Sequence, residues 1–255
     1  MIRQCLVLAV LVGSEAAQAQ PPSYTAASIV NASDYSAGPF APNSVLSIFG
    51  SNLSWVTAMY IPQSGQATLP VQLANVRVGV DLWPAPLLYV SPTQINFLIP
   101  STEVSGTAVV SVVREGVTGP PVTITLVSSA PALFSTATGF AIATHLDGSL
   151  LSDAHPGRAG EFVVVYSTGL GPTSPNPPPG VIPTTAATID LFSDLSVSLN
   201  GTPLPSVLVP YAGVTPGYAG LYQLNVKLPP QVPVDPAIQV SVGGQGSASL
   251  KLAVQ

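Results

Sequence analysis

Beyond the N-terminal segment, the hydrophobic residues form short runs that Pro and Gly separate, and several runs alternate with polar residues. In the run LSVSL, Leu195, Val197 and Leu199 fall on one side of an extended chain and two serines fall on the other. A strand with one face in a core and one in water has this period of two. No helical period is sustained, so the pattern predicts an all-β chain.

Two local patterns refine this prediction. Phe162 to Tyr166 (FVVVY) is apolar at every position, which is typical of a central strand covered on both sides. Asn200-Gly201 follows an alternating run, and both residues tolerate a positive φ, so this pair predicts a tight hairpin turn.

The chain contains an internal repeat, because three segments of its first half recur in the same order in its second half. The matching pairs are 44–53 with 161–170, 76–86 with 195–205, and 94–100 with 223–229. Matches in the same order indicate a duplicated unit. The second copy carries extra residues at 210–220, which we interpret as a loop rich in Gly and Pro.

Each copy is expected to hold about seven short strands, the number found in an immunoglobulin-like sandwich. The predicted strands are 26–31, 44–50, 74–80, 85–90, 94–99, 106–114 and 121–127, then 140–145, 161–168, 195–199, 204–209, 221–228, 237–242 and 247–254. The predicted fold class is therefore all-β, with two tandem immunoglobulin-like β-sandwich domains. We place them at 20–130 and 131–255. The connector, 128–135, is short and partly apolar, so we expect end-to-end packing with limited freedom.

The N-terminus has the order of features of a signal peptide. Arg3 precedes the apolar run Cys5 to Gly13, and Ala17-Gln18-Ala19 forms a small-residue cleavage site. We expect cleavage between Ala19 and Gln20, so that 1–19 is removed and the protein is secreted or extracytoplasmic, in the periplasm or at the cell surface. The apolar run is too short to span a bilayer, and we expect no membrane span in the mature chain.

Composition narrows the chemistry further. Charged residues make up 7% of the chain, against about 25% in a typical soluble domain. Cys5 is the one cysteine, so a mature chain cut after Ala19 has no disulfide and no thiolate. Phosphate binding needs clustered Lys and Arg, whereas the basic residues here are scattered, so we expect no nucleic-acid partner. These residues are Arg77, Arg114, Arg158, Lys227 and Lys251.

The segment Ala41 to Ser54 (APNSVLSIFGSNLS) resembles the opening of IPT/TIG domains, an immunoglobulin-like group. The chain as a whole resembles an uncharacterised bacterial family of secreted proteins that carry a duplicated module of this kind, usually at the C-terminal end. The segments that carry this resemblance are 29–32, 85–100, 130–134, 147–149, 166–172 and 218–229. The resemblance implies the sandwich fold and secretion. It implies no activity and no catalytic residues.

His145, Asp147, Asp153 and His155 lie close together in the sequence and could ligate a metal ion such as zinc. The alternative is a strand end, an Asp-Gly turn and a solvated loop. No pair has a known metal-site spacing, so we assign neither a metal ion nor a cofactor.

The motifs of common hydrolases do not occur in this sequence. It contains no G-x-S-x-G elbow, and we interpret Ser167 as the polar end of a buried strand. No paired carboxylates for glycoside hydrolysis stand out. We therefore expect a protein that is not an enzyme.

Three aromatic residues, Trp55, Tyr60 and Trp83, fall in or beside predicted loops and are the candidate ligand-binding residues. Exposed aromatic rings can stack on sugars, and sites are often carried by loops on a rigid sandwich. The alternative is that these rings cap the open ends of the core, because large aromatics are buried on average. Thr202 occupies the place of Trp83 in the second copy, which favours a surface role for Trp83.

These observations predict a secreted or cell-surface, non-catalytic structural, adhesion or interaction module. Its expected partner is an extracellular protein or a component of the cell envelope. The alternative is a carbohydrate-binding module that uses the loop aromatics and binds a polysaccharide.

Overall fold

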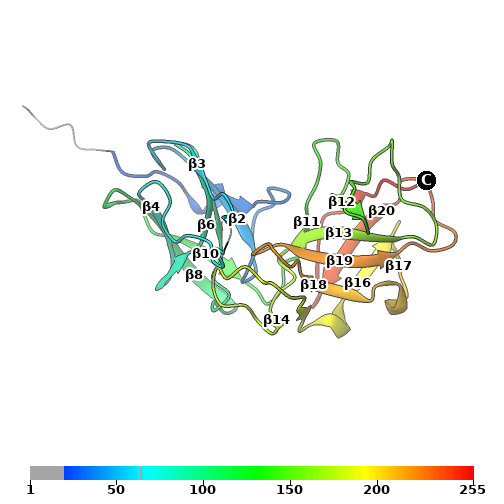
Figure 1. The fold of residues 1–255 in the computed structure, drawn as a ribbon. Helices are drawn as coiled ribbons and strands as arrows, with labels where there is room; N and C mark the ends of the chain where they lie inside the picture. Colours follow the sequence, from blue (N-terminus) through cyan, green and yellow to red (C-terminus); the bar gives the residue numbers. More distant parts are fainter. Residues whose placement is uncertain (1–19, 64) are drawn as a thin grey trace, which may run out of the picture.

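The computed structural model describes residues 20–63 and 65–255, which form two β-sandwiches arranged end to end (Figure 1). The predicted signal peptide, 1–19, lies outside the described residues. The fold class predicted from the sequence, all-β with tandem immunoglobulin-like sandwiches, is confirmed. The helical turns in the described part of the chain are short 3-10 segments, and none is long and apolar enough to cross a membrane. They are η1 (Ala26–Ser28), η2 (Phe192–Asp194) and η3 (Ser206–Leu208).

The first sandwich, here called the first domain, packs two antiparallel sheets around one core. One sheet has the order β1-β2-β7-β6-β3, and the other has the order β10-β8-β4-β5 with β9 paired to β8. The strands are β1 (Ile29–Asn31), β2 (Val45–Phe49), β3 (Ala58–Met59), β4 (Val76–Val80), β5 (Trp83–Ala85), β6 (Leu87–Val90), β7 (Gln94–Leu98), β8 (Gly106–Arg114), β9 (Val117–Thr118) and β10 (Val122–Leu126). Alternate residues of both sheets, such as Ile48, Phe97 and Val112, are fully buried between them.

The second sandwich, here called the second domain, repeats this arrangement. Its larger sheet has the order β11-β13-β19-β18-β15-β14 with β12 paired to β13, and its smaller sheet has the order β17-β16-β20-β21 with β22 paired to β20. The strands are β11 (Ala132–Leu133), β12 (Ala143–His145), β13 (Phe162–Thr168), β14 (Thr173–Ser174), β15 (Thr188–Ile189), β16 (Ser196–Leu199), β17 (Thr202–Pro203), β18 (Tyr211–Val214), β19 (Tyr222–Lys227), β20 (Ala237–Val242), β21 (Gln245–Gly246) and β22 (Leu250–Lys251).

The hairpin predicted at Asn200-Gly201 is confirmed. The two residues join β16 to β17, with φ values of 49° and 76°. The alternation predicted for β16 is confirmed too, because Val197 and Leu199 face the core.

Strand β13 differs from its prediction. It does lie between two partner strands, and Val163 and Val165 are buried in the core. On its other side Val164 is also buried, whereas Phe162 and Tyr166 are only partly buried. A strand that is apolar at every position can therefore have one face that is partly exposed to solvent. On that face the side chains of neighbouring residues shield the apolar groups in part.

The prediction of a strand at 204–209 is wrong. The interpretation of 210–220 as a loop is wrong for 211–214, which form a strand, and agrees with the structure for 215–220, which form turns. Pro205 has no N–H to donate to a sheet and instead precedes the 3-10 turn η3. The strand comes later, as β18, which pairs with β19 and β15. Gly213 is required there, because an added Cβ would lie 2.1 Å from the Ala187 carbonyl oxygen.

Where the two domains meet they form a contact region that we call the joint. Thr68 and Val181 form an antiparallel bridge between them. Leu69 N donates to Gly180 O over 2.9 Å. A short piece of sheet pairing therefore links two loops that lie more than a hundred residues apart in the sequence.

Side chains complete the joint. Thr168 Oγ1 accepts a hydrogen bond from Val45 N (3.1 Å) and donates one to Gly220 O (3.0 Å). Val45 and Leu98 of the first domain belong to a small apolar cluster at the joint, packed against Ala219 of the second. This cluster is separate from the two cores and joins the domains through apolar contact as well as hydrogen bonds.

Candidate functional site

Trp55 lies at the end of the first domain that points away from the joint, which we call the outer end. It follows β2, and 52% of its surface is exposed. The Arg114 guanidinium carbon lies 3.8 Å from the centroid of the indole ring. The indole Nε1 donates a hydrogen bond to Glu115 Oε2 over 2.8 Å. A buried cation therefore holds one ring face and a carboxylate holds the edge, which leaves the opposite face open to a ligand.

Arg114 is 1% exposed, and backbone carbonyl oxygens hold its guanidinium in place. It donates to the carbonyl oxygens of Asn52 and, over 2.6 Å, of Gln20. Its Nε is buried without a partner among the described residues. The guanidinium thus connects β8 to the N-terminal segment at Gln20 and to the loop after β2 at Asn52. The Trp55 ring covers the guanidinium.

The second domain shows that the sandwich itself does not need this arginine. Arg114 ends β8 before a two-residue turn, and Val242 ends β20 before the corresponding turn. Val242 is fully buried, and Gly243 stands where the first domain has Glu115. The cation, the carboxylate and the indole are therefore a feature of the first domain alone within this repeat.

A polar surface pocket of about 510 Å³ adjoins Trp55 and shares Glu115 with it. Gln72, Asn75 and Arg77 also line this pocket. Arg77 Nε donates to Gln72 Oε1 over 2.7 Å, and Gln72 Nε2 donates to Asn75 Oδ1 over 3.3 Å. An open aromatic face beside amide, guanidinium and carboxylate groups can stack on a ring and hydrogen-bond to its substituents.

The structure does not bring Trp83 to this site. Trp83 pairs with Val80 at one end of β4, whereas Arg114 pairs with Val76 at the other end. At about 3.3 Å per residue, these two positions are about 13 Å apart along the strand. Trp83 is 49% exposed, as expected for a surface residue, beside Leu82, which is 95% exposed.

Tyr60 lies at the joint and not at the outer end. Its ring packs on the cluster that contains Val45, Leu69 and Leu98. Its hydroxyl is buried and has no hydrogen-bond partner among the described residues. For Tyr60 the packing interpretation therefore agrees with the structure, and Trp55 is the member of the three with an open ring face and a polar pocket beside it.

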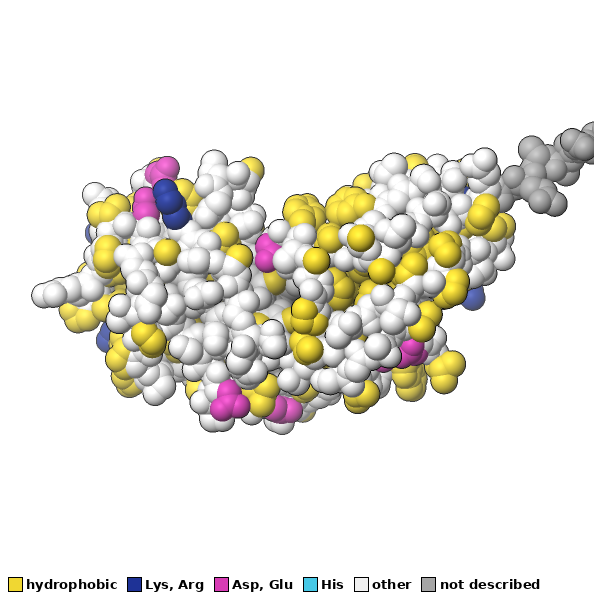
Figure 2. Space-filling view, turned by 180° about the vertical axis from the view of Figure 1, so that it is seen from behind, with side chains coloured by type: hydrophobic (Ala, Val, Ile, Leu, Met, Phe, Trp, Pro, Cys, Tyr) yellow, Lys and Arg dark blue, Asp and Glu magenta, His cyan; other side chains and the backbone are white. Residues whose placement is uncertain are grey.

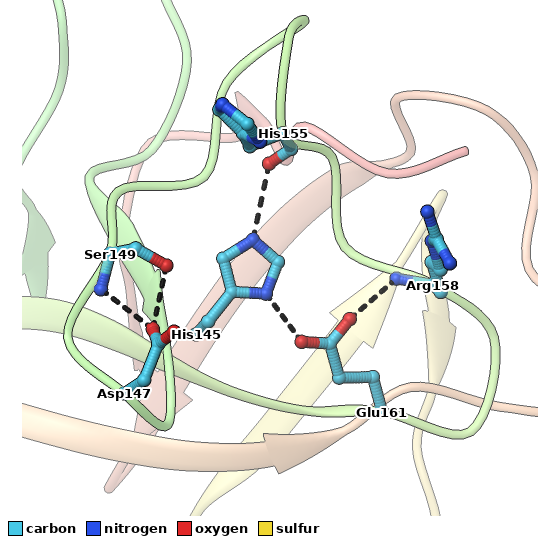
Figure 3. Close-up of polar contacts among 6 residues, drawn as sticks. All are labelled: His145, Asp147, Ser149, His155, Arg158 and Glu161. Carbon is cyan, nitrogen blue, oxygen red and sulfur yellow. Dashed lines mark hydrogen bonds and ion pairs between the residues drawn. The ribbon is translucent and has the colours of Figure 1, made fainter.

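Three of the four His and Asp residues singled out in the sequence, His145, Asp147 and His155, lie at a different site, at the outer end of the second domain (Figure 3). The fourth, Asp153, lies in an exposed turn between Ser152 and His155. His145 Nδ1 bonds to Glu161 Oε1, and its Nε2 bonds to the backbone oxygen of His155 over 3.2 Å. The His155 ring points away from His145 (Figure 3). Asp147 accepts hydrogen bonds from the backbone and hydroxyl of Ser149 instead.

Both partners of the His145 ring are acceptors, so the ring satisfies both of them as a doubly protonated imidazolium. The hydrogen bond to Glu161 raises the pKa of His145 above its ordinary value, and its partial burial opposes this effect. Glu161 Oε2 accepts from Arg158 N over 2.9 Å, so the pair fastens the loop between β12 and β13. Within residues 20–63 and 65–255, no group of three or more His, Cys, Asp or Glu side chains is placed to hold a metal ion.

Local sequence patterns do not mark Arg114, Glu115 or Glu161 as site residues. Trp55 is separated from Glu115 by 60 residues, and no local pattern links them. The pairing of β12 with β13 accounts for the position of Glu161. His145 lies opposite Val163, and Glu161 precedes Val163 by two residues, so its side chain is on the same side of the strand.

The sequence matches no protein-family model and no curated protein. Among solved structures, it is similar to the surface glycan-binding protein PbSGBP-B from Prevotella bryantii at 14% identity and a TM-score of 0.26, over 90% of this chain and 41% of that one. It is similar to the tandem Ig repeats of Dlar at 12% identity and a TM-score of 0.22, over 84% and 91%. It is similar to the adhesin InvE from Yersinia pseudotuberculosis at 11% identity and a TM-score of 0.24, over 83% of this chain and 54% of that one. TM-scores of this size carry no inference about function.

Proposed function

We propose that this protein is a non-catalytic interaction module that works outside the cytoplasm, at the cell surface, and that its contact surface is centred on Trp55. The observation that carries the proposal is the pinned and exposed indole, with Arg114 on one face and solvent on the other. A rigid aromatic ring loses little conformational entropy when a ligand covers it. The predicted signal peptide and the resemblance to secreted proteins with a duplicated IPT/TIG-like module support the location.

A pull-down of residues 20–255 on isolated cell envelopes tests this proposal. We expect the chain to be retained and Trp55→Ala to lose most of the retention, since aromatic anchors commonly dominate an interface. Trp83→Ala is the matched control, because it removes a tryptophan of similar exposure from the same domain. Equal retention of both variants and the parent chain would contradict the role of Trp55.

A second candidate function is saccharide binding at the same ring. The polar pocket beside Trp55, with its amide and guanidinium groups, favours this candidate. If it holds, soluble oligosaccharides released from the envelope will compete for retention. If a protease treatment of the envelope removes retention and the oligosaccharides do not compete, the partner is a protein.

A further inference from the structure

The two domains carry the same group of side chains on the open face of the larger sheet. Gln94 and Asn96 lie on β7, and Gln223 and Asn225 lie at the matching positions on β19. The residues between them, Ile95 and Leu224, are fully buried. Because side chains alternate along a strand, all four amides point away from the core.

An aromatic ring stands beside each amide pair. Phe49 on β2 is opposite Gln94, and Tyr166 on β13 is opposite Gln223. Residues directly opposite each other in an antiparallel pair share a face. A tyrosine on the other neighbouring strand completes each group, with Tyr89 opposite Asn96 and Tyr211 opposite Asn225.

The two amides of each pair are hydrogen-bonded to each other in both domains, and in the first domain Asn96 Oδ1 also accepts a bond from Ser47 Oγ on β2 over 2.9 Å. Gln94 Nε2 donates to Asn96 Oδ1 over 2.8 Å, and Gln223 Nε2 donates to Asn225 Oδ1 over 3.0 Å. The Gln–Asn bond of each pair lies within a single strand, whereas the Ser47–Asn96 bond of the first domain joins β2 to β7. Among the described residues the Asn Nδ2 and the Gln Oε1 have no hydrogen-bond partner, so each pair keeps a free donor and a free acceptor.

Other surface positions differ between the two domains, which makes this agreement informative. Position 83 is Trp where position 202 is Thr, and the exposed Arg77 corresponds to Ser196. A solvent-facing sheet position accepts many residue types, so packing alone does not require Gln and Asn at these places in both copies.

We infer that each domain binds a neutral saccharide on this face, with a sugar ring against Phe49 or Tyr166 and its hydroxyls on the neighbouring Gln and Asn amides. A hydroxyl group both donates and accepts, so neighbouring hydroxyls match an adjacent amide donor and acceptor. None of the eight side chains is charged. Charged groups are sparse over the one face of the molecule that Figure 2 shows, in keeping with the 7% of charged residues in the sequence. The inference rests on the proposed binding role but does not depend on Trp55.

Extended peptides bind sandwiches mainly by adding a strand at a sheet edge, through backbone hydrogen bonds. The group described here lies on the face of the sheet instead, two strands in from β3 in the first domain. Face binding through amides and rings favours a saccharide over a peptide.

Native gels that contain xylan, xyloglucan, galactomannan, hydroxyethylcellulose or laminarin test the inference with residues 20–255. We expect at least one of these neutral polysaccharides to retard the chain. Gln94→Ala and Gln223→Ala should each weaken association about two- to tenfold at its own site, the effect of one lost hydrogen bond, and the double variant should lose most of the retardation. Gln245→Ala, an exposed amide on the smaller sheet of the second domain, is the matched control.

The inference is overturned if none of the five polysaccharides retards the chain, or if the double variant is retarded as strongly as the parent. Trp55→Ala run in the same gels separates the two sites. If only Trp55→Ala loses retardation, the result supports the contact surface at Trp55 and contradicts saccharide binding on the sheet faces. Loss with the Gln double variant alone would support the sheet-face sites and place no saccharide at Trp55.

Discussion

Each domain has one end in the joint and one outer end, and equivalent positions of the repeat differ according to which end they occupy. Val45 and Leu98 pair in the joint, whereas their equivalents Phe162 and Lys227 pair at the outer end of the second domain. There the Lys227 ammonium lies 5.6 Å from the centroid of the Phe162 ring and the side chain is exposed.

The same contrast holds for two further pairs of positions. The register of β1 on β2 places Asn31 where the second domain has His145, and the repeat aligns Ser44 with Glu161. The first domain therefore has two uncharged residues at the positions where the outer end of the second domain has the His145–Glu161 ion pair. At the opposite ends of the sandwiches, Arg114 of the outer end corresponds to the apolar Val242 near the joint, whose carbonyl accepts from Ser129 Oγ over 2.8 Å.

This comparison teaches that the same sandwich can either contact a neighbouring domain or face solvent at a given end, depending on a few residues at that end. At the outer ends Lys227 is exposed to water, and the buried Arg114 is compensated by two backbone carbonyl oxygens. The same charges inside the joint would lose their water without such compensation. Small and apolar residues at the joint allow close approach: a Cβ added to Gly220 would lie 2.3 Å from Leu98 Cδ1. The positions that differ most between the copies are therefore those that distinguish contact with a neighbour from contact with solvent.

The largest expected effect is at Leu98, which is fully buried in the joint. Leu98→Ala should lower the free energy of unfolding by about 2–5 kcal/mol, the range for a large buried side chain cut to alanine. Lys227→Ala, at the equivalent exposed position, should change it by less than about 0.5 kcal/mol. Urea unfolding of both variants measures this difference. Equal losses would show that the two positions do not differ in burial as described.

Arg114→Met comes next, because it leaves two backbone carbonyls without their donor. We expect a loss of about 1–3 kcal/mol in the free energy of unfolding, together with a change in tryptophan fluorescence as Trp55 loses its support. Arg77→Met removes an exposed arginine from the neighbouring strand and is the control. An unchanged stability for Arg114→Met would contradict a structural role for the buried guanidinium.

The His145–Glu161 pair should make stability depend on pH in a defined direction. The pKa of His145 is raised in the folded state, so protonation favours folding. Its contribution is full below about pH 6.5, the ordinary pKa of histidine, and is lost as the pH rises through the folded-state pKa. The difference in melting temperature between the parent and His145→Gln should therefore shrink from pH 5 toward pH 8. A difference that grows with pH would be opposite to this expectation.

The smallest effect is expected for Trp83→Thr, which installs the residue that the second domain has at this position. Trp83 is half exposed, so the free energy of unfolding should stay within about 0.5 kcal/mol of the parent value. Retention on cell envelopes should also be unchanged, since Trp83 lies away from Trp55. A marked loss of retention would move the contact surface toward the β4–β5 hairpin.

Much of the fold could be predicted from residues near one another in the sequence. The alternation in β16 and the turn at Asn200-Gly201 depend on a few consecutive residues, and both were confirmed. The region of η3 and β18 could not be predicted, because Gly213 is decisive only through its contact with Ala187, the residue before β15. Of the site at the outer end, the sequence indicated Trp55 but gave no signal for Arg114 or Glu115.

The sequence by itself determined that this protein is an all-β chain, because period-two patterns and turn residues act over short distances. The repeat within it also determined that one unit is used twice. Only the tertiary structure decided which end of each unit is joined and which is open, and which of three aromatic residues has an open ring face beside a polar pocket. Those outcomes depend on contacts between residues far apart in the chain, and such contacts exist only once the sheets have paired and the two domains have packed together.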